Sequence, residues 1–184
     1  MSIVKVILVG ELQVGKTTII NQYINYSFEE DLCATLAAFK SRKDININEN
    51  TLNLELWDTS GAKSYRGVNK IYMRNIDIAL LIYDVTNRIS FEELNYWIQE
   101  VKEINNYRKV LFVVIGNKFD LYEERVIEEE EGKKFANNNN ALFFETSAKD
   151  LESVENAFFI LCEEYLNKLE KEEKEAFLQY VKSI

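Results

Sequence analysis

The sequence predicts an α/β protein in which helices alternate with the strands of a doubly wound, mostly parallel sheet. Short runs rich in Val, Ile and Leu, at residues 3–9, 78–83 and 110–115, are typical of parallel strands that are buried on both faces. Stretches with helical periodicity separate these runs, and no linker or internal repeat interrupts the 184 residues. We expect six strands and five helices in one domain over residues 1–170, followed by a charged helical extension over 171–184.

The first half of the chain contains four of the expected strands. The run at residues 3–9 is followed by a helix over 16–25. Residues 41–47 and 51–57 alternate apolar and polar side chains on either side of three polar residues, which predicts a hairpin with a solvated edge. The apolar run at 78–83 is the fourth strand.

The second half contains two strands and the longer helices. Ser90 and Glu93 fit a capping box, which predicts a helix that ends near Ile104. Strands over 110–115 and 142–145 enclose a helix near 128–136. A long C-terminal helix carries apolar side chains at spacings of three or four, which indicates a face packed on the core: Val154, Phe158, Leu161, Tyr165 and Leu169.

Composition excludes several classes of function. The chain has no His, which removes Ser-His-Asp catalysis and the common zinc sites. Its two cysteines, Cys33 and Cys162, are too few for a Cys₄ metal site or a dense disulfide framework, and we interpret them as reduced, packed thiols. A formal net charge of −9 opposes binding to nucleic acid or to an anionic membrane, and no segment has the apolar length of a membrane span. We expect a soluble, cytoplasmic protein.

Residues 10–17 read Gly-Glu-Leu-Gln-Val-Gly-Lys-Thr, which is a phosphate-binding loop between a buried strand and the start of a helix. Glycines at both ends allow the backbone N–H groups to face phosphate oxygens, and the helix N-terminus adds partial positive charge. We expect Lys16 to reach the β- and γ-phosphates and the Thr17 hydroxyl to bind Mg²⁺. The other residues assigned to phosphate binding here are Gln13, Val14, Gly15 and Thr18.

Asp58 and Gly61 follow directly after the strand that ends at Trp57. A carboxylate at the carboxyl end of a strand, facing the phosphate-binding loop, suits a hard cation such as Mg²⁺. The Gly61 N–H is the expected donor to a γ-phosphate.

The quartet Asn117-Lys118-Phe119-Asp120 closes a strand and indicates which base is bound. Guanine presents two adjacent donors that one carboxylate accepts together, whereas adenine presents an acceptor there, so Asp120 favours guanine. The stem of Lys118 and the ring of Phe28 are expected to sandwich the base. Ser147, Ala148 and Lys149, after the next strand, are expected to supply a backbone N–H to the guanine 6-oxygen.

These four motifs occur in the order of the Ras superfamily of small GTPases, and the chain resembles its Rab branch most closely, from Ile3 to about Tyr165. Rab-like stretches include residues 56–59, 82–86 and 144–149. The resemblance implies a small-GTPase fold and a GTP/GDP switch ordered by the γ-phosphate and Mg²⁺. It also implies that Thr35 binds Mg²⁺, and that effectors, exchange factors and GTPase-activating proteins contact two switch segments, residues 29–39 and 60–72.

The chain departs from the family pattern at the position that follows Gly61. The family usually has Gln there to orient the attacking water, and this chain has Ala62, so we expect slow hydrolysis. Leu12 and Gln13 are bulkier than the usual residues of the loop; Leu12 is placed to obstruct an inserted arginine, and Gln13 is a weak alternative for positioning water. The segment that begins at Thr35 is one residue shorter than the Rab pattern.

We therefore expect a weak GTPase that serves vesicle trafficking, with Lys16, Thr35 and Gly61 acting on the γ-phosphate. The alternative is a pseudo-GTPase, a nucleotide-locked module that acts through partner binding. An ATP-dependent enzyme is disfavoured by Asp120. The chain has no cysteine after Cys162 to carry a prenyl group, so peripheral contact with endomembranes is expected only through partners or through a lipidated tail outside this sequence.

Overall fold

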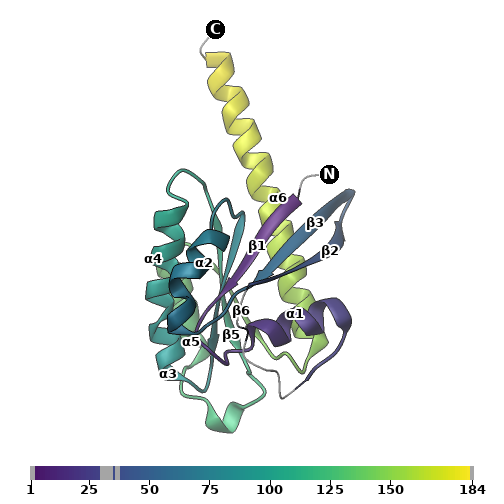
Figure 1. Ribbon diagram of the computed structural model, residues 1–184. Coiled ribbons are helices and arrows are strands. Elements are labelled where there is room, and N and C mark those ends of the chain that lie inside the picture. The colour runs from purple at the N-terminus through teal and green to yellow at the C-terminus, as the bar shows by residue number, and fades with distance from the viewer. Residues whose placement is uncertain (1–2, 30–34, 36–37, 183–184) are drawn as a thin grey trace.

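The computed structural model describes residues 3–29, 35 and 38–182 and has the α/β architecture expected from the sequence (Figure 1). Its six-stranded sheet has the order β2-β3-β1-β4-β5-β6, in which β2 and β3 are antiparallel and all other neighbours are parallel. The strands are β1 (Ile3–Val9), β2 (Phe39–Ile47), β3 (Asn50–Asp58), β4 (Ile78–Asp84), β5 (Leu111–Asn117) and β6 (Leu142–Thr146).

The helices connect successive strands. They are α1 (Lys16–Asn25), α2 (Arg66–Tyr72), α3 (Arg88–Glu92), α4 (Leu94–Ile104), α5 (Glu129–Asn138) and α6 (Leu151–Lys182), with two short 3₁₀ turns, η1 (Lys63–Tyr65) and η2 (Tyr122–Glu124). Only Glu93 separates α3 from α4. Within the described ranges, counting this pair as one bent helix gives the five helices expected.

The expected capping box at Ser90 is wrong. Helix α3 begins at Arg88, and its N-cap is Asn87, whose side chain accepts a hydrogen bond from the Ser90 N–H at 3.2 Å. Ser90 is fully buried, and its hydroxyl donates to the Asn87 carbonyl and accepts from the Asp84 N–H. Asn87 takes the cap because its backbone is extended and its short amide reaches the third residue of the turn.

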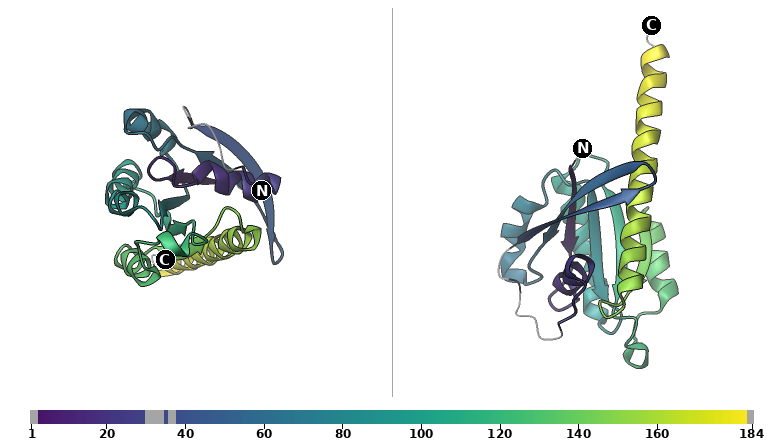
Figure 2. Two further views of the ribbon diagram at one scale, coloured as in Figure 1. Left: turned by 90° about the horizontal axis from the view of Figure 1, so that it is seen from below. Right: turned by 90° about the vertical axis from the view of Figure 1, so that its right-hand side faces the viewer.

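Helices cover both faces of the sheet, so that two apolar clusters enclose it (Figures 1 and 2). One cluster packs α1 and α6 on the face that carries Val6 and Leu80, and includes stacked rings of Tyr23 and Phe158 with centroids 3.8 Å apart. The other packs α2 to α5 on the face that carries Ile7. Burial on both faces explains why the central strands read as continuous apolar runs.

The hairpin expected from the alternating pattern is confirmed. Strands β2 and β3 pair from Phe39 opposite Asp58 to Ile47 opposite Asn50, and β2 forms the edge of the sheet. Asn48 in the turn has a φ of 54°, a left-handed conformation that Asn tolerates better than most residues.

Helix α6 has its apolar stripe against the sheet, as expected. Val154, Phe158, Leu161 and Tyr165 are buried, and Leu169 packs on the same cluster. The helix then continues to Lys182, and its C-terminal part extends beyond the sheet (Figure 1). The boundary between the domain and the charged extension at residue 170 stays a prediction.

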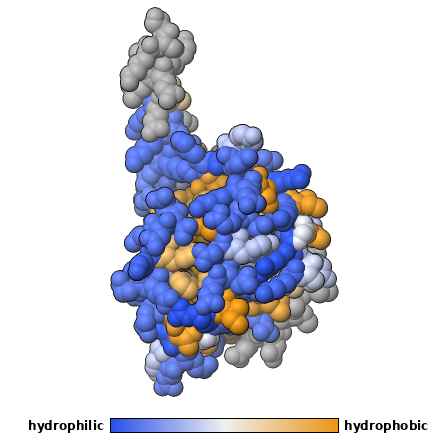
Figure 3. Space-filling view, turned by 90° about the vertical axis from the view of Figure 1, so that its left-hand side faces the viewer, coloured by the Kyte–Doolittle hydropathy of each residue, from blue (hydrophilic) through white to orange (hydrophobic). Residues whose placement is uncertain are grey.

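Figure 3 shows that the face that carries α4 is largely hydrophilic, with smaller groups of apolar side chains. In the described part of the chain, no helix combines the length and the apolar character needed to cross a membrane.

Candidate functional site

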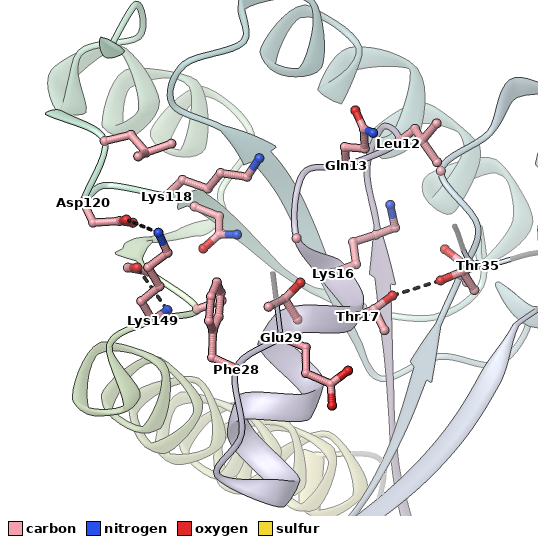
Figure 4. A pocket seen from close by; sticks show the side chains of 18 residues that line it. Leu12, Gln13, Lys16, Thr17, Phe28, Glu29, Thr35, Lys118, Asp120 and Lys149 are labelled. Atoms are coloured by element: carbon pink, nitrogen blue, oxygen red, sulfur yellow. Dashed lines mark hydrogen bonds and ion pairs between the residues drawn. The ribbon is translucent and has the colours of Figure 1, made fainter. Parts of the chain in front are cut away.

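A pocket of about 460 Å³ opens at the carboxyl ends of the parallel strands, where the loops after β1, β3, β5 and β6 meet α1 (Figure 4). This is the place where open α/β sheets bind ligands. Its lining contains nearly all of the residues singled out from the sequence: Gln13, Gly15, Lys16, Thr17, Thr18, Phe28, Thr35, Gly61, Asn117, Lys118, Asp120, Ser147, Ala148 and Lys149.

Two of the expected site residues do not line the pocket. Val14 is fully buried, and its side chain belongs to the core, so only its backbone remains available to a ligand. Asp58 is buried and contacts Thr17 and Thr35, which do line the pocket. The lining also includes residues that were not expected, namely Glu29, Thr59 and Leu121, each of which directly follows an expected residue in the sequence.

Glycine is required at both ends of the phosphate-binding loop. Gly10 has a φ of +150°, and a Cβ there would lie 2.2 Å from the Ile82 carbonyl oxygen of β4. Gly15 has a φ of +95°, and a Cβ there would lie 2.2 Å from Nδ2 of Asn117. The loop is therefore pressed against β4 and β5, which leaves no room for side chains at these two positions.

Lys16 is held inside this loop. It is 6% exposed, and its Nζ donates to the carbonyl oxygens of Gly10 at 2.9 Å and Glu11 at 2.8 Å. Burial lowers the pKa of Lys16 to about 8. An anion in the pocket would favour the charged form of this amine, because its negative charge attracts the ammonium group.

Three side chains bring their oxygen atoms together beside the phosphate-binding loop: those of Thr17, Thr35 and Asp58. The Thr17 hydroxyl donates to Oδ2 of Asp58 at 2.6 Å, and the Thr17 and Thr35 hydroxyl oxygens lie 2.9 Å apart. Oδ1 of Asp58 is buried with no hydrogen-bond partner among the described residues, and burial raises the pKa of this carboxyl. One carboxylate and two hydroxyls, with an unpaired buried oxygen, fit Mg²⁺, which takes few protein ligands beside substrate phosphates.

The side chain of Asn117 links the phosphate-binding loop to the end of β6. Its amide Nδ2 donates to the Val14 carbonyl at 2.8 Å, and its Oδ1 accepts from the Thr146 hydroxyl at 3.1 Å. Asn117 is 1% exposed. Its side chain therefore holds the phosphate-binding loop and the end of β6 at a fixed distance.

Asp120, Lys149 and Phe28 surround the other end of the pocket (Figure 4). Nζ of Lys149 lies 3.7 Å from Oδ2 of Asp120 and 5.5 Å from the centre of the Phe28 ring. Nζ of Lys118 pairs with Asp84 at 2.6 Å, which directs the amine to the end of β4 and leaves the stem along the pocket.

The backbone of residues 147–149 forms a tight turn beside these side chains. Ser147 donates its N–H to the Ser153 hydroxyl, and Lys149 donates its N–H to the Ser147 hydroxyl. Between them, the Ala148 N–H has no hydrogen-bond partner within the described ranges. This turn can therefore offer one free donor to a ligand.

The backbone of Gly61 packs against the backbone of the phosphate-binding loop. A Cβ at Gly61 would lie 2.4 Å from the carbonyl oxygen of Glu11 and 2.5 Å from the N of Leu12. Ala62 follows with an extended backbone, and its N–H lies 3.4 Å from Oγ of Ser60. Ala62 thus directly follows a residue that packs on the phosphate-binding loop, and its side chain is only a methyl group.

Two sequence expectations fall partly outside the described residues. The expected switch segment 29–39 lies partly outside the described residues, since it includes residues 30–34 and 36–37. Cys33 lies in the same stretch, whereas Cys162 is a buried free thiol, as expected.

Comparison with known proteins gives a consistent result. A profile of the Ras family matches residues 5–167. The chain is 37% identical over 166 residues to the Ras-related protein Rab-2B of Dictyostelium discoideum, an alignment that covers 90% of this chain and 82% of the relative. It is 41% identical over 154 residues to Ras-related protein RabQ of the same organism, covering 84% and 75%. It is 35% identical over 168 residues to human Ras-related protein Rab-17, covering 91% and 79%.

Proposed function

This chain belongs to the Ras family as a Rab-like small GTPase, and from its pocket we propose that it is a Mg²⁺-dependent GTP/GDP switch that hydrolyses GTP slowly. The observation that carries the proposal is one pocket with a phosphate-binding loop at one end and the Asp120 carboxylate at the other. A single buried amide, that of Asn117, fixes the separation of the two ends.

Guanine specificity is proposed for the base end. Asp120 accepts the two adjacent donors of guanine, and the Ala148 N–H donates to the 6-oxygen. Phe28 and the stem of Lys118 pack on the two faces of the base. Adenine would leave the carboxylate of Asp120 and the Ala148 N–H without suitable partners, which penalises it by about 1–3 kcal/mol per unpaired group.

At the phosphate end, we assign Lys16 and Gly61 as donors to the γ-phosphate, with the N–H groups of residues 13–18 around the β-phosphate. Thr17, Thr35 and Asp58 would hold Mg²⁺, Asp58 directly or through water. When bound, the ion offsets the negative charge of the phosphate oxygens. Burial lowers the pKa of Lys16 to about 8, and the negative charge of the phosphates would oppose this effect and favour the charged amine.

Slow hydrolysis is proposed because Ala62 has no polar atom in its side chain. A methyl group cannot orient a water molecule for in-line attack, and no His is present in the chain to act as a base. Leu12, which is 42% exposed at the mouth of the pocket, stands in the way of an arginine supplied by a GTPase-activating partner.

The proposed cellular role is in vesicle trafficking, through effectors and exchange factors that contact residues 29–39 and 60–72. It is supported by the Rab names of the relatives. Peripheral association with endomembranes belongs to the same proposal and would come from such partners or from a lipidated tail outside this sequence, because the net charge of −9 opposes direct binding to anionic lipid.

The test is to identify the nucleotide that the purified protein carries, released by denaturation and separated by chromatography. Guanine nucleotide in near-stoichiometric amount is expected, with GTP in excess over GDP if hydrolysis is slow. Lys16→Ala is the control and should purify without nucleotide. GDP alone would overturn slow hydrolysis, GTP that persists for days with added Mg²⁺ would favour the nucleotide-locked alternative, and adenine nucleotide would overturn the base assignment.

A further inference from the structure

We propose that Arg66 is a positioning residue that clamps the segment beginning at Gly61 onto the phosphate-binding loop, and that this clamp selects the triphosphate over the diphosphate. The inference rests on the proposed function, since it concerns the same nucleotide site. It assigns a role to Arg66, Glu11 and Glu93, none of which lines the pocket.

Arg66 is the first residue of α2, and its guanidinium bridges two other parts of the chain. Nη2 donates to Oε1 of Glu11 in the phosphate-binding loop at 2.6 Å and to Oε2 of Glu93 at the junction of α3 and α4 at 2.7 Å. The guanidinium also lies over the ring of Tyr96 on α4, 4.0 Å from its centre. Arg66 thus fixes α2 simultaneously to the loop and to the neighbouring helices.

The bridge is sheltered from solvent. The side chains of Arg66, Glu11 and Glu93 are 18%, 14% and 23% exposed. Salt and water therefore screen the two ion pairs of Arg66 less than they would screen ion pairs at an open surface. Hydrogen bonding from Arg66 lowers the pKa of Glu93, as expected for a carboxylate that is held in its charged form. Charge-assisted bonds of this length are the stronger class of hydrogen bond in proteins.

The segment between Gly61 and Arg66 is fixed at both ends. At its start, the Gly61 backbone is so close to Glu11 and Leu12 that a Cβ would collide with them. At its end, Arg66 holds the Glu11 side chain. The turn η1 between them is closed by a hydrogen bond from the Tyr65 N–H to the Ala62 carbonyl at 2.9 Å. Glu11 therefore contacts both ends of one short segment, which acts as a rigid unit.

This geometry favours the triphosphate because the clamp keeps the Gly61 backbone against the phosphate-binding loop. In the proposed function that N–H donates to the γ-phosphate, a group that the diphosphate lacks. Loosening the clamp lets Gly61 leave the loop and removes a donor that only the triphosphate uses. The affinity for GTP should then fall while the affinity for GDP stays nearly constant, because Lys16 and the N–H groups of the loop remain in place.

The experiment measures the affinities of the full chain for GDP and for the non-hydrolysable GTP analogue GppNHp, with excess Mg²⁺, by displacement of a fluorescent GDP. Arg66→Gln should lower the ratio of GppNHp affinity to GDP affinity by about tenfold or more, the loss expected for one hydrogen bond to a charged group. Glu11→Gln, in which the loop backbone is unchanged, should lower it similarly. The double variant should be no worse than Arg66→Gln alone, because that substitution already removes the bond to Glu11.

Lys70→Gln is the matched control. Lys70 also lies on α2 and pairs with α4, through Glu100 at 2.6 Å, but that pair does not reach the phosphate-binding loop. Its ratio should equal that of the unmodified chain. An unchanged ratio in Arg66→Gln and Glu11→Gln, or an equal fall in Lys70→Gln, would overturn the clamp while leaving the nucleotide switch intact. An unmodified chain that binds neither nucleotide would instead overturn the proposed function and the clamp with it.

Discussion

Replacing Asn117 by Ala tests whether one buried amide holds the two ends of the pocket together. The substitution removes the bond from Nδ2 to the Val14 carbonyl and the bond from Thr146 to Oδ1. Each buried partner left unpaired costs about 1–3 kcal/mol, so the loss of folding free energy should be about 2–4 kcal/mol once partial relaxation is allowed for. The same change frees the phosphate-binding loop, and because 1.4 kcal/mol corresponds to about tenfold, nucleotide release should accelerate by at least about tenfold.

Asn105→Ala is the control for a buried amide that serves the fold alone. Asn105 is 5% exposed, and its Nδ2 donates to the carbonyls of Met73 at 2.7 Å and Val101 at 3.0 Å. It lies at the C-terminus of α4, beside the segment that leads into the start of β4, whereas the pocket is at the carboxyl ends of the strands. We expect a comparable loss of stability with no change in nucleotide release.

The assay follows fluorescent GDP leaving the protein after addition of excess unlabelled GDP, and thermal unfolding is recorded at one fixed concentration of GDP and Mg²⁺. If Asn117→Ala releases GDP at the rate of the unmodified protein while losing as much stability as Asn105→Ala, the amide is structural only. The reasoning is then refuted, because the loop does not depend on the link to β6.

Three further changes probe the base, the water position and the core. Asp120→Asn should shift preference from GTP to XTP, because the xanthine 2-oxygen accepts where guanine donates; an unchanged preference in a competition assay contradicts the role of the carboxylate. Ala62→Gln should raise single-turnover GTP hydrolysis at least about tenfold if only the water-orienting side chain is missing, and Ala62→Asn, whose amide is one methylene shorter, is its control. Burial raises the pKa of the Cys162 thiol to about 12. Because the thiol of the unfolded chain titrates near 8.5, the protonated, buried thiol makes its full contribution to stability below about pH 8.5. That contribution is lost as the pH rises from about 8.5 through 12. In a Cys33→Ser background, alkylation at pH 8 should be no faster than the opening of the structure around Cys162, and rapid alkylation of the native protein would contradict the burial of this thiol.

Much of the fold and of the site could be predicted because the relevant signals are local. Continuous apolar runs indicate strands buried on both faces, and the polar motif that follows each run must lie at the same edge of a parallel sheet. Lys16, Thr17, Asp120 and Ala148 were therefore expected in one pocket, and all four line it. The absence of Gln after Gly61 is likewise visible from the sequence alone.

Capping and the links between loops could not be predicted in this way. Ser90 and Glu93 match a capping box, yet Asn87 caps the helix, because the choice depends on which residue the preceding strand leaves extended. Asn117 belongs to the motif that the sequence assigns to base binding. Its side-chain amide instead forms hydrogen bonds with Val14 and Thr146, which are far from it in the sequence.

The sequence alone supplies the residue types of the pocket: the glycines and the lysine of the phosphate-binding loop, the Asp120 carboxylate proposed for guanine, the oxygens of Thr17, Thr35 and Asp58 proposed for Mg²⁺, and Ala62 where the family usually has Gln. How those groups are held in place depends on the three-dimensional packing of the chain. The bridge from Arg66 to Glu11 and Glu93 joins residues that are 55 and 27 positions apart. Such contacts depend on how α2 and α4 pack on the sheet, and residue types along the chain do not specify which charged side chains that packing brings together.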